Sequence, residues 1–253
     1  MRKKIAAGNW KMNTTLVKGQ QLASEVINMV ADELTDDVQV ILIPPYFQLT
    51  GIKKLIGSSE KVFLGAQNVH QEDSGAFTGE VSAEMLQSCG VTHVVVGHSE
   101  RREYFGEDEA LLAAKVKKVL EFGMTPIFCC GEKLEIRESE KHFDLNKTQV
   151  EGALFGLSAE EIQKVVIAYE PVWAIGTGVT ASADQAQEMH AFIRGLISEK
   201  YGSDVADSIS ILYGGSVKPG NAKELFACAD VDGGLVGGAS LKSRDFTEIA
   251  KSF

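Results

Sequence analysis

The chain has 253 residues, of which 44% are hydrophobic and 24% are charged, and its formal net charge is −10 at pH 7. This composition is typical of a globular protein with a sizeable core, and the acidic surface makes nucleic acid and anionic membranes poor partners. No stretch approaches the roughly 18 apolar residues of a membrane span, and the N-terminal segment lacks the apolar core of a signal peptide. We therefore expect a cytoplasmic protein.

Short apolar runs rich in β-branched residues recur along the chain. We predict strands at 4–8, 38–43, 62–66, 91–97, 124–130, 165–169, 209–213 and 231–237. These runs are almost continuously apolar instead of alternating, which is typical of parallel strands that are covered on both faces.

Helical patterns separate the predicted strands. We predict helices over 15–34, 47–56, 80–89, 108–122, 133–155, 182–200, 221–228 and 241–251. Thr14 or Thr15 can cap the first of these helices, and Ser182 with Gln185 forms a capping-box pattern at another. Gly123 follows the helix over 108–122 and suits a left-handed stop.

The alternation of strands and helices predicts an α/β protein built from βα units. Eight such units in a chain of this length match a (β/α)8 barrel, with eight parallel strands ringed by helices. No low-complexity run or linker divides the sequence, so we expect a single domain over residues 1–253. A doubly wound sheet is the alternative that this pattern leaves open.

One segment interrupts the rhythm of the predicted elements. Residues 68–82, after the third strand, are polar and contain glycine, with no clear period. A structureless loop of this length is uncommon in a compact domain unless it has a function. We interpret the loop as a candidate subunit contact, and an ordinary surface loop is the alternative.

Polar residues and glycines follow several of the predicted strands. They are Asn9, Lys11, His98, Glu170, Ser216, Gly237 and Gly238. In a barrel of this kind the active site lies at the carboxyl ends of the strands, so we expect these residues to meet at one rim.

The most informative of these residues is Glu170. It follows an apolar run and precedes Pro171, which biases Glu170 toward extended backbone, so its carboxylate suits a general base on a rigid strand end. An ion pair is the structural alternative. Lys11 could instead be a solvated lysine, and His98 an ordinary polar residue at a strand end.

The glycine pairs at the last two strand ends indicate an anion site. Gly215 with Ser216, and Gly237 with Gly238, let backbone N–H groups approach a phosphate closely. A short helix after such a strand can also point its N-terminus at the anion.

The sequence gives no good candidate for a metal site. His98 and Glu100 would share a face of an extended segment, but no third ligand is evident. The cysteines form no C-x-x-C pair, so we expect reduced, structural thiols. They are Cys89, Cys129, Cys130 and Cys228.

Six motifs, in order, resemble those of the triosephosphate isomerase family. They are 8-GNWKMN-13, 65-GAQN-68, 97-GHSERR-102, 168-AYEPVWAIGTG-178, 213-YGGSV-217 and 235-LVGGASLK-242. The resemblance runs the whole length of the chain. It implies an intramolecular aldose–ketose isomerase of glycolysis and gluconeogenesis, which interconverts dihydroxyacetone phosphate and D-glyceraldehyde 3-phosphate through an enediolate, without a metal or organic cofactor.

The resemblance also implies a role for each residue that matches a motif. Glu170 matches the catalytic base, His98 the electrophile, Lys11 the lysine that meets the anionic substrate, and Asn9 the asparagine beside it. The residues that match the backbone phosphate ligands of the family are Gly176, Ser216, Gly237 and Gly238. Thr78 matches a residue that reaches across the interface of a cytosolic homodimer toward the partner's active site.

The segment after Glu170 is expected to form a lid over the site. Residues 171–173 would be a stiff first hinge, residues 174–176 the tip, and residues 177–179 the second hinge. Such a lid would grip the phosphate and exclude water, which suppresses the elimination of phosphate from the enediolate.

Three other functions are compatible with a barrel of this kind. A Schiff-base aldolase would need a desolvated lysine inside the barrel, whereas Glu170 stands at the sixth strand where such aldolases tend to carry it. A metal-dependent sugar-phosphate epimerase would be sensitive to chelators. A catalytically inactive scaffold would have no reason to retain Lys11, His98 and Glu170.

Overall fold

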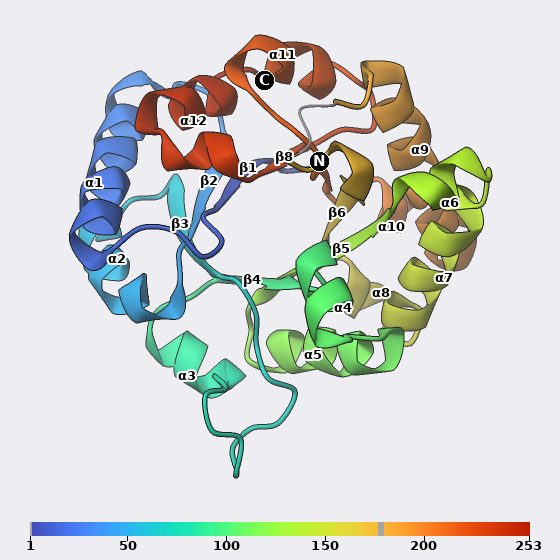
Figure 1. Cartoon of the computed structure of the whole chain (residues 1–253), viewed down its shortest axis with the longest axis horizontal. Coiled ribbons are helices and arrows are strands. Elements are labelled where there is room, and N and C mark those ends of the chain that lie inside the picture. Colours follow the sequence, from blue (N-terminus) through green and yellow to red (C-terminus); the bar gives the residue numbers. More distant parts are fainter. Residues whose placement is uncertain (1, 177–179) are drawn as a thin grey trace.

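A computed structural model describes residues 2–176 and 180–253. Within this part of the chain eight parallel strands close into a barrel in their order along the sequence (Figure 1). The strands are β1 Lys4–Asn9, β2 Val38–Ile43, β3 Val62–Ala66, β4 His93–Val96, β5 Thr125–Glu132, β6 Val166–Pro171, β7 Ile211–Tyr213 and β8 Gly233–Val236. Since β1 pairs with β8, the predicted barrel is confirmed and the doubly wound sheet is wrong.

Helices surround the barrel (Figure 1). The longer ones are α1 Leu16–Glu33, α2 Leu49–Ile56, α5 Glu109–Glu121, α7 His142–Leu154, α9 Ala183–Tyr201, α11 Pro219–Phe226 and α12 Ser243–Ala250. The shorter ones are η1 Tyr46–Gln48, α3 Ala83–Ser88, α4 Ser99–Phe105, α6 Leu134–Glu138, α8 Ala159–Ile162, η2 Val172–Ala174, α10 Ser203–Ala206 and η3 Gly238–Leu241.

Local signals placed some helix ends correctly and others not. Ser182 and Gln185 form the predicted capping box of α9, and Gly123 follows α5 with φ of +68°. Thr15 occupies the N-cap position of α1, but its side chain makes no capping hydrogen bond. The single helix predicted over 133–155 is wrong: it is divided into α6 and α7 at Glu140, whose φ of +59° cannot continue a helix.

The apolar runs are continuous because both faces of each strand are buried. Alternate residues of the strands fill the barrel interior, and the others pack against the helices. Adjacent Cys129 and Cys130 illustrate this, since Cys129 lies inside the barrel and Cys130 faces outward. All four cysteines are free thiols, and burial raises the pKa of Cys129 and raises that of Cys130 to about 12.

A buried ionic cluster joins α9 to the segment that leads into β8. The guanidinium of Arg194 donates to Asp230 Oδ1 at 2.6 Å and to Asp232 Oδ2 at 2.8 Å. It also donates to the carbonyls of Ala206 and Ile209, at 2.7 and 2.9 Å. The cluster thereby fixes a helix to the amino end of the barrel, opposite the rim where the candidate catalytic residues lie.

Arg194→Met is expected to lower the free energy of unfolding by up to about 3–5 kcal/mol, because it takes the buried cation from Asp232 and leaves only Arg2, whose Nε lies 3.2 Å from Oδ1 of Asp232. Urea unfolding of the purified variant measures the change. The matched control is Arg244→Met, which breaks a pair whose arginine is 53% exposed and is expected to shift the midpoint far less. Equal shifts would contradict a stabilising role for the buried cluster.

Two histidines are buried in the neutral form away from the rim. Burial lowers the pKa of His93, and likewise that of His190, to about 4. His93 lies in β4 against Phe63, and His190 lies in α9 with Nδ1 at 3.1 Å from the carbonyl of Asp230. The pKa of an imidazole in the unfolded chain is about 6.5. Between about pH 4 and about pH 6.5 the unfolded chain therefore binds more protons than the folded chain.

Stability is therefore expected to fall as the pH is lowered from about 6.5 to about 4, with part of the slope due to His190. Urea unfolding at a series of pH values, compared between the wild type and His190→Asn, isolates that part. The variant should show a shallower slope below about pH 6.5 and a slope equal to that of the wild type above it. Parallel curves throughout the range would overturn the assignment.

Candidate active site

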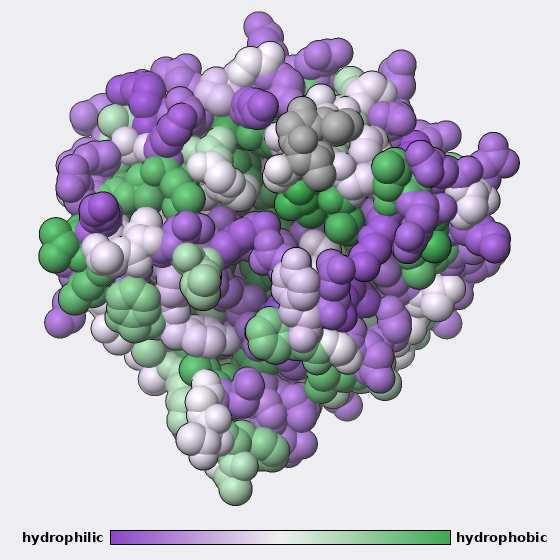
Figure 2. All heavy atoms as spheres, viewed as in Figure 1, coloured by the Kyte–Doolittle hydropathy of each residue, from purple (hydrophilic) through white to green (hydrophobic). Residues whose placement is uncertain are grey.

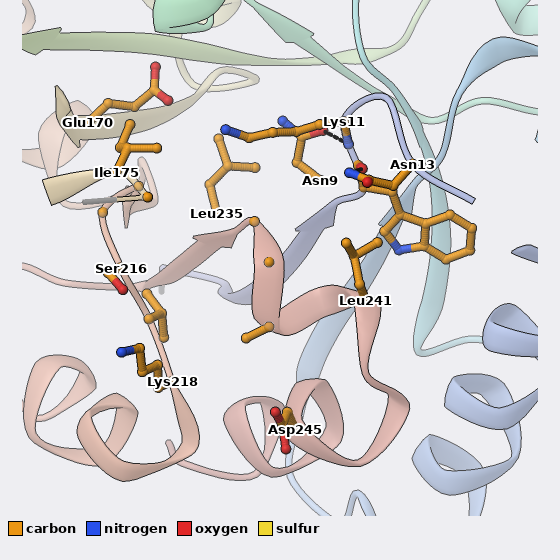
Figure 3. Close-up of a pocket in the computed structure, with 18 of the residues that line it drawn as sticks. Asn9, Lys11, Asn13, Glu170, Ile175, Ser216, Lys218, Leu235, Leu241 and Asp245 are labelled. Atoms are coloured by element: carbon orange, nitrogen blue, oxygen red, sulfur yellow. Dashed lines mark hydrogen bonds between the residues drawn. The ribbon is translucent and has the colours of Figure 1, made fainter. Parts of the chain in front are cut away.

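The strand ends enclose a cavity of about 450 Å³ (Figure 3). It is lined by all the residues that the sequence singled out for catalysis and substrate binding: Asn9, Lys11, His98, Glu170, Gly176, Ser216, Gly237 and Gly238. These residues come from both ends of the chain and from its middle, and the barrel brings them to one rim. Hydrophilic side chains dominate the same face of the molecule in Figure 2.

Glu170 is buried near the end of β6, with 1% of its surface exposed. Its Oε2 accepts a hydrogen bond from the backbone N–H of Ser99 at 2.9 Å, and its Oε1 lies 3.1 Å from Nε2 of His98. Two glycines make room for it. A Cβ on Gly131 would lie 1.8 Å from the carbonyl oxygen of Glu170, and one on Gly214 would lie 2.9 Å from its Cγ.

His98 is the N-cap residue of α4, and 6% of its surface is exposed. The Nδ1 atom accepts the backbone N–H of Glu100 at 3.2 Å. An accepting Nδ1 carries no proton, so the ring proton lies on Nε2, the atom that faces Glu170. The histidine therefore presents a hydrogen-bond donor toward the cavity.

Lys11 is held in an uncommon backbone conformation, with φ of +51°. Its N–H donates to the side chain of Asn9 at 3.0 Å, and its carbonyl accepts from Nε2 of Gln67 at 2.8 Å. Its Nζ donates to Glu100 Oε1 at 2.5 Å. The support from Gln67 is not evident in the sequence, because the two residues meet only in the folded barrel.

Glycines, Ser216 and two lysines line the far wall of the cavity. Ser216 follows β7, and Gly237 and Gly238 follow β8, where η3 begins. Lys218 and Lys242 also line the cavity, and sequence reasoning missed both. Asp245 lines the same wall, 3.7 Å from Lys242. Backbone N–H groups beside Lys218 are suited to an anion such as phosphate.

The first hinge and the tip of the predicted lid lie within the described residues. Val172–Ala174 form the short helix η2, and Ile175 and Gly176 line the cavity. Trp173 donates its indole N–H to Oε1 of Glu132 at 3.0 Å, which anchors the first hinge. The second hinge predicted at residues 177–179 lies outside the described residues.

Glu132 is a further functional candidate that sequence reasoning missed. It ends β5, is 1% exposed, and accepts a second hydrogen bond at Oε1 from the hydroxyl of Tyr169 at 2.8 Å. The signal available was an acid at the end of an apolar run, the same signal that marked Glu170.

The described residues offer no metal-binding cluster and no membrane-spanning helix. In residues 2–176 and 180–253, no three His, Cys, Asp or Glu side chains group in a way that could hold a metal ion. No helix in the same ranges is long and apolar enough to cross a membrane.

Comparison with known proteins adds independent information. A family model described as triosephosphate isomerase matches residues 4–253. A curated protein named triosephosphate isomerase from Cytophaga hutchinsonii is 61% identical over 253 residues, which cover 100% of both chains. Proteins of the same name from Bacteroides fragilis and Porphyromonas gingivalis are 54% and 53% identical, also over 100% of both chains.

Proposed function

This chain belongs to the triosephosphate isomerase family, and we propose that it interconverts dihydroxyacetone phosphate and D-glyceraldehyde 3-phosphate in glycolysis and gluconeogenesis. The observation that carries the proposal is one cavity that joins a buried carboxylate, an imidazole N–H and a lysine to a wall suited to phosphate. The enzyme would act as an intramolecular aldose–ketose isomerase on one domain that spans residues 1–253.

The reaction begins with removal of a proton from the carbon beside the substrate carbonyl. The electron pair forms an enediolate, and the base then returns the proton to the neighbouring carbon. We assign Glu170 as the base, because its carboxylate stands on a rigid strand end at the cavity. Its hydrogen bonds to Ser99 and His98 are the contacts with which a bound substrate would compete.

The enediolate needs groups that stabilise its negative charge. The Nε2–H of neutral His98 can donate to each of the two oxygens in turn. Lys11 adds a fixed positive charge, and its pairing with Glu100 holds the ammonium in place. Because these side chains supply the electrophilic groups, we assign no metal and no organic cofactor to the reaction.

The substrate phosphate is assigned to the opposite wall. We propose that backbone N–H groups of Gly176, Ser216, Gly237 and Gly238 bind it, with Asn9 beside Lys11 on the reacting side. Ile175 at the cavity would exclude water when the lid segment approaches, and this suppresses elimination of phosphate.

We further propose a cytoplasmic homodimer in which loop 68–82 contacts the partner. The loop projects from the body of the barrel (Figure 1), and Phe77 within it is 43% exposed. A hydrophobic side chain on a projecting loop is suited to burial in a subunit interface. Thr78, next to Phe77, would reach toward the partner's active site.

Glu170→Asp is expected to retain the fold and lose on the order of 10²–10⁴ in turnover, because the shorter side chain withdraws the base from the substrate carbon. The measurement is conversion of D-glyceraldehyde 3-phosphate to dihydroxyacetone phosphate, with a chelator present and no metal added. Near-normal turnover of the variant would remove Glu170 from the role, and no turnover of the folded wild type would overturn the proposed reaction.

Lys11→Met is expected to weaken both substrate binding and turnover while leaving the melting curve similar, because the methionine keeps the apolar stem and removes the charge. KM, kcat and thermal unfolding are compared with those of Lys164→Met. Lys164 is an exposed lysine just before β6, at the opposite end of the barrel, and its removal should change none of the three. Equal kinetics in both variants would contradict the assignment.

A further inference from the structure

Helix α7 directs two buried polar side chains at the end of β5. Asn146 is fully buried and Gln149 is 6% exposed, and they stand three residues apart, which places them on the same face of the helix. Their partners are consecutive residues of β5, Gly131 and Glu132. Burying an amide costs free energy unless its hydrogen bonds are made, and Oδ1 of Asn146 has no hydrogen-bond partner among the described residues, so the pair calls for an explanation beyond packing.

Gln149 holds the Gly131 peptide from both sides. Its Oε1 accepts the N–H of Gly131 at 2.8 Å, and its Nε2 donates to the carbonyl of Gly131 at 3.2 Å. Gly131 is the register partner of Glu170 in the adjacent strand, and the two backbones approach so closely that no side chain fits at Gly131. A shift of this peptide therefore displaces the backbone that carries the base.

Asn146 holds the carboxylate of Glu132. Its Nδ2 donates to Oε2 of Glu132 at 3.1 Å and to the carbonyl of His142 at 2.8 Å, so both of its N–H bonds are used. Oε1 of Glu132 accepts from Trp173 at 3.0 Å and from Tyr169 at 2.8 Å, and Nη1 of Arg137 lies 3.6 Å from it. The amide thus fixes which carboxylate oxygen faces the first hinge of the lid.

We propose that Asn146 and Gln149 are positioning residues for the isomerisation: Gln149 places the base through Gly131, and Asn146 places the foot of the lid through Glu132. This inference rests on the proposed function. Each residue acts on a different part of the site, so their removal has different kinetic consequences.

The test replaces each amide by leucine, which is of similar size and has no hydrogen-bonding group. Gln149→Leu is expected to lower kcat by roughly tenfold to a hundredfold with little change in KM, because a displacement of about 1 Å at the base is sufficient for this. Asn146→Leu is expected to raise KM and the amount of inorganic phosphate released per isomerised product. Val150→Ala, a buried apolar truncation on the same helix, is the control for lost stability.

A second readout does not depend on activity. The chain has two tryptophans, Trp10 and Trp173, so a Trp10→Phe background leaves Trp173 as the reporter. Asn146→Leu should change the emission of Trp173, because Oε2 of Glu132 loses its hydrogen bond and the carboxylate beside the indole can then rotate. Gln149→Leu and Val150→Ala should leave the emission of Trp173 unchanged. If the leucine variants fail to fold, Asn146→Asp and Gln149→Glu replace them, since each is nearly isosteric with the native residue. Asn146→Asp places an oxygen against Oε2 of Glu132, and Gln149→Glu places one against the carbonyl of Gly131. These variants should show the same separate effects on the lid foot and on kcat.

The outcomes separate the two proposals. A kcat loss confined to Gln149, with phosphate release and altered Trp173 emission confined to Asn146, supports the positioning roles. If both variants have the same kinetics and the same Trp173 emission as Val150→Ala, the positioning roles are overturned. An inactive wild type whose Trp173 emission responds to Asn146→Leu alone would reject the proposed reaction, while supporting the link from Asn146 to the lid foot.

Discussion

Closure of the barrel is the constraint on which the site depends. β1 pairs with β8 in parallel, so the residues after Asn9 and those after Val236 meet although more than two hundred positions separate them. The closure requires a glycine at 233, where a Cβ would lie 1.9 Å from the carbonyl oxygen of Ile5. Because all eight strands are parallel, every strand end faces the same rim, and polar side chains gather there without disturbing the core.

Two neighbouring strands each carry a buried acid to that rim, and strand geometry gives the acids different surroundings. Glu170 lies opposite Gly131 in the register, and Glu132 lies opposite Pro171. Residues one position apart along paired strands point to opposite faces, so Glu170 lines the cavity while Glu132 points toward the surrounding helices. Two carboxylates only one register step apart therefore have different surroundings, and the proposals made above give them different tasks, proton transfer and support of the lid.

The barrel could be predicted because its signal is local: continuous apolar runs show that both strand faces are buried. The position of Glu170 could be predicted because burial of a carboxylate at the end of an apolar run costs free energy, which marks the residue as a candidate for function. Glu132 carries the same signal and was missed, since only the tertiary contacts to Asn146 and Trp173 identify its role. The break between α6 and α7 at Glu140 could not be predicted, because a glutamate at positive φ gives no signal in the sequence, whereas a glycine or proline would.

An acidic chain can still attract an anionic substrate because the relevant field is local. The net charge of −10 is spread over the whole surface, and salt screens it beyond about 8 Å at physiological ionic strength. Lys11, Lys218 and Lys242 all line one cavity, within the range where screening is weak. Lys11 is already paired with Glu100, which keeps the ammonium at the reacting end. On the far wall Lys242 lies 3.7 Å from Asp245, which also lines the cavity, so Lys218 and the backbone N–H groups are the main groups left to complement a phosphate. With the phosphate there, the proposed function places the carbonyl end of the substrate toward Glu170 and His98.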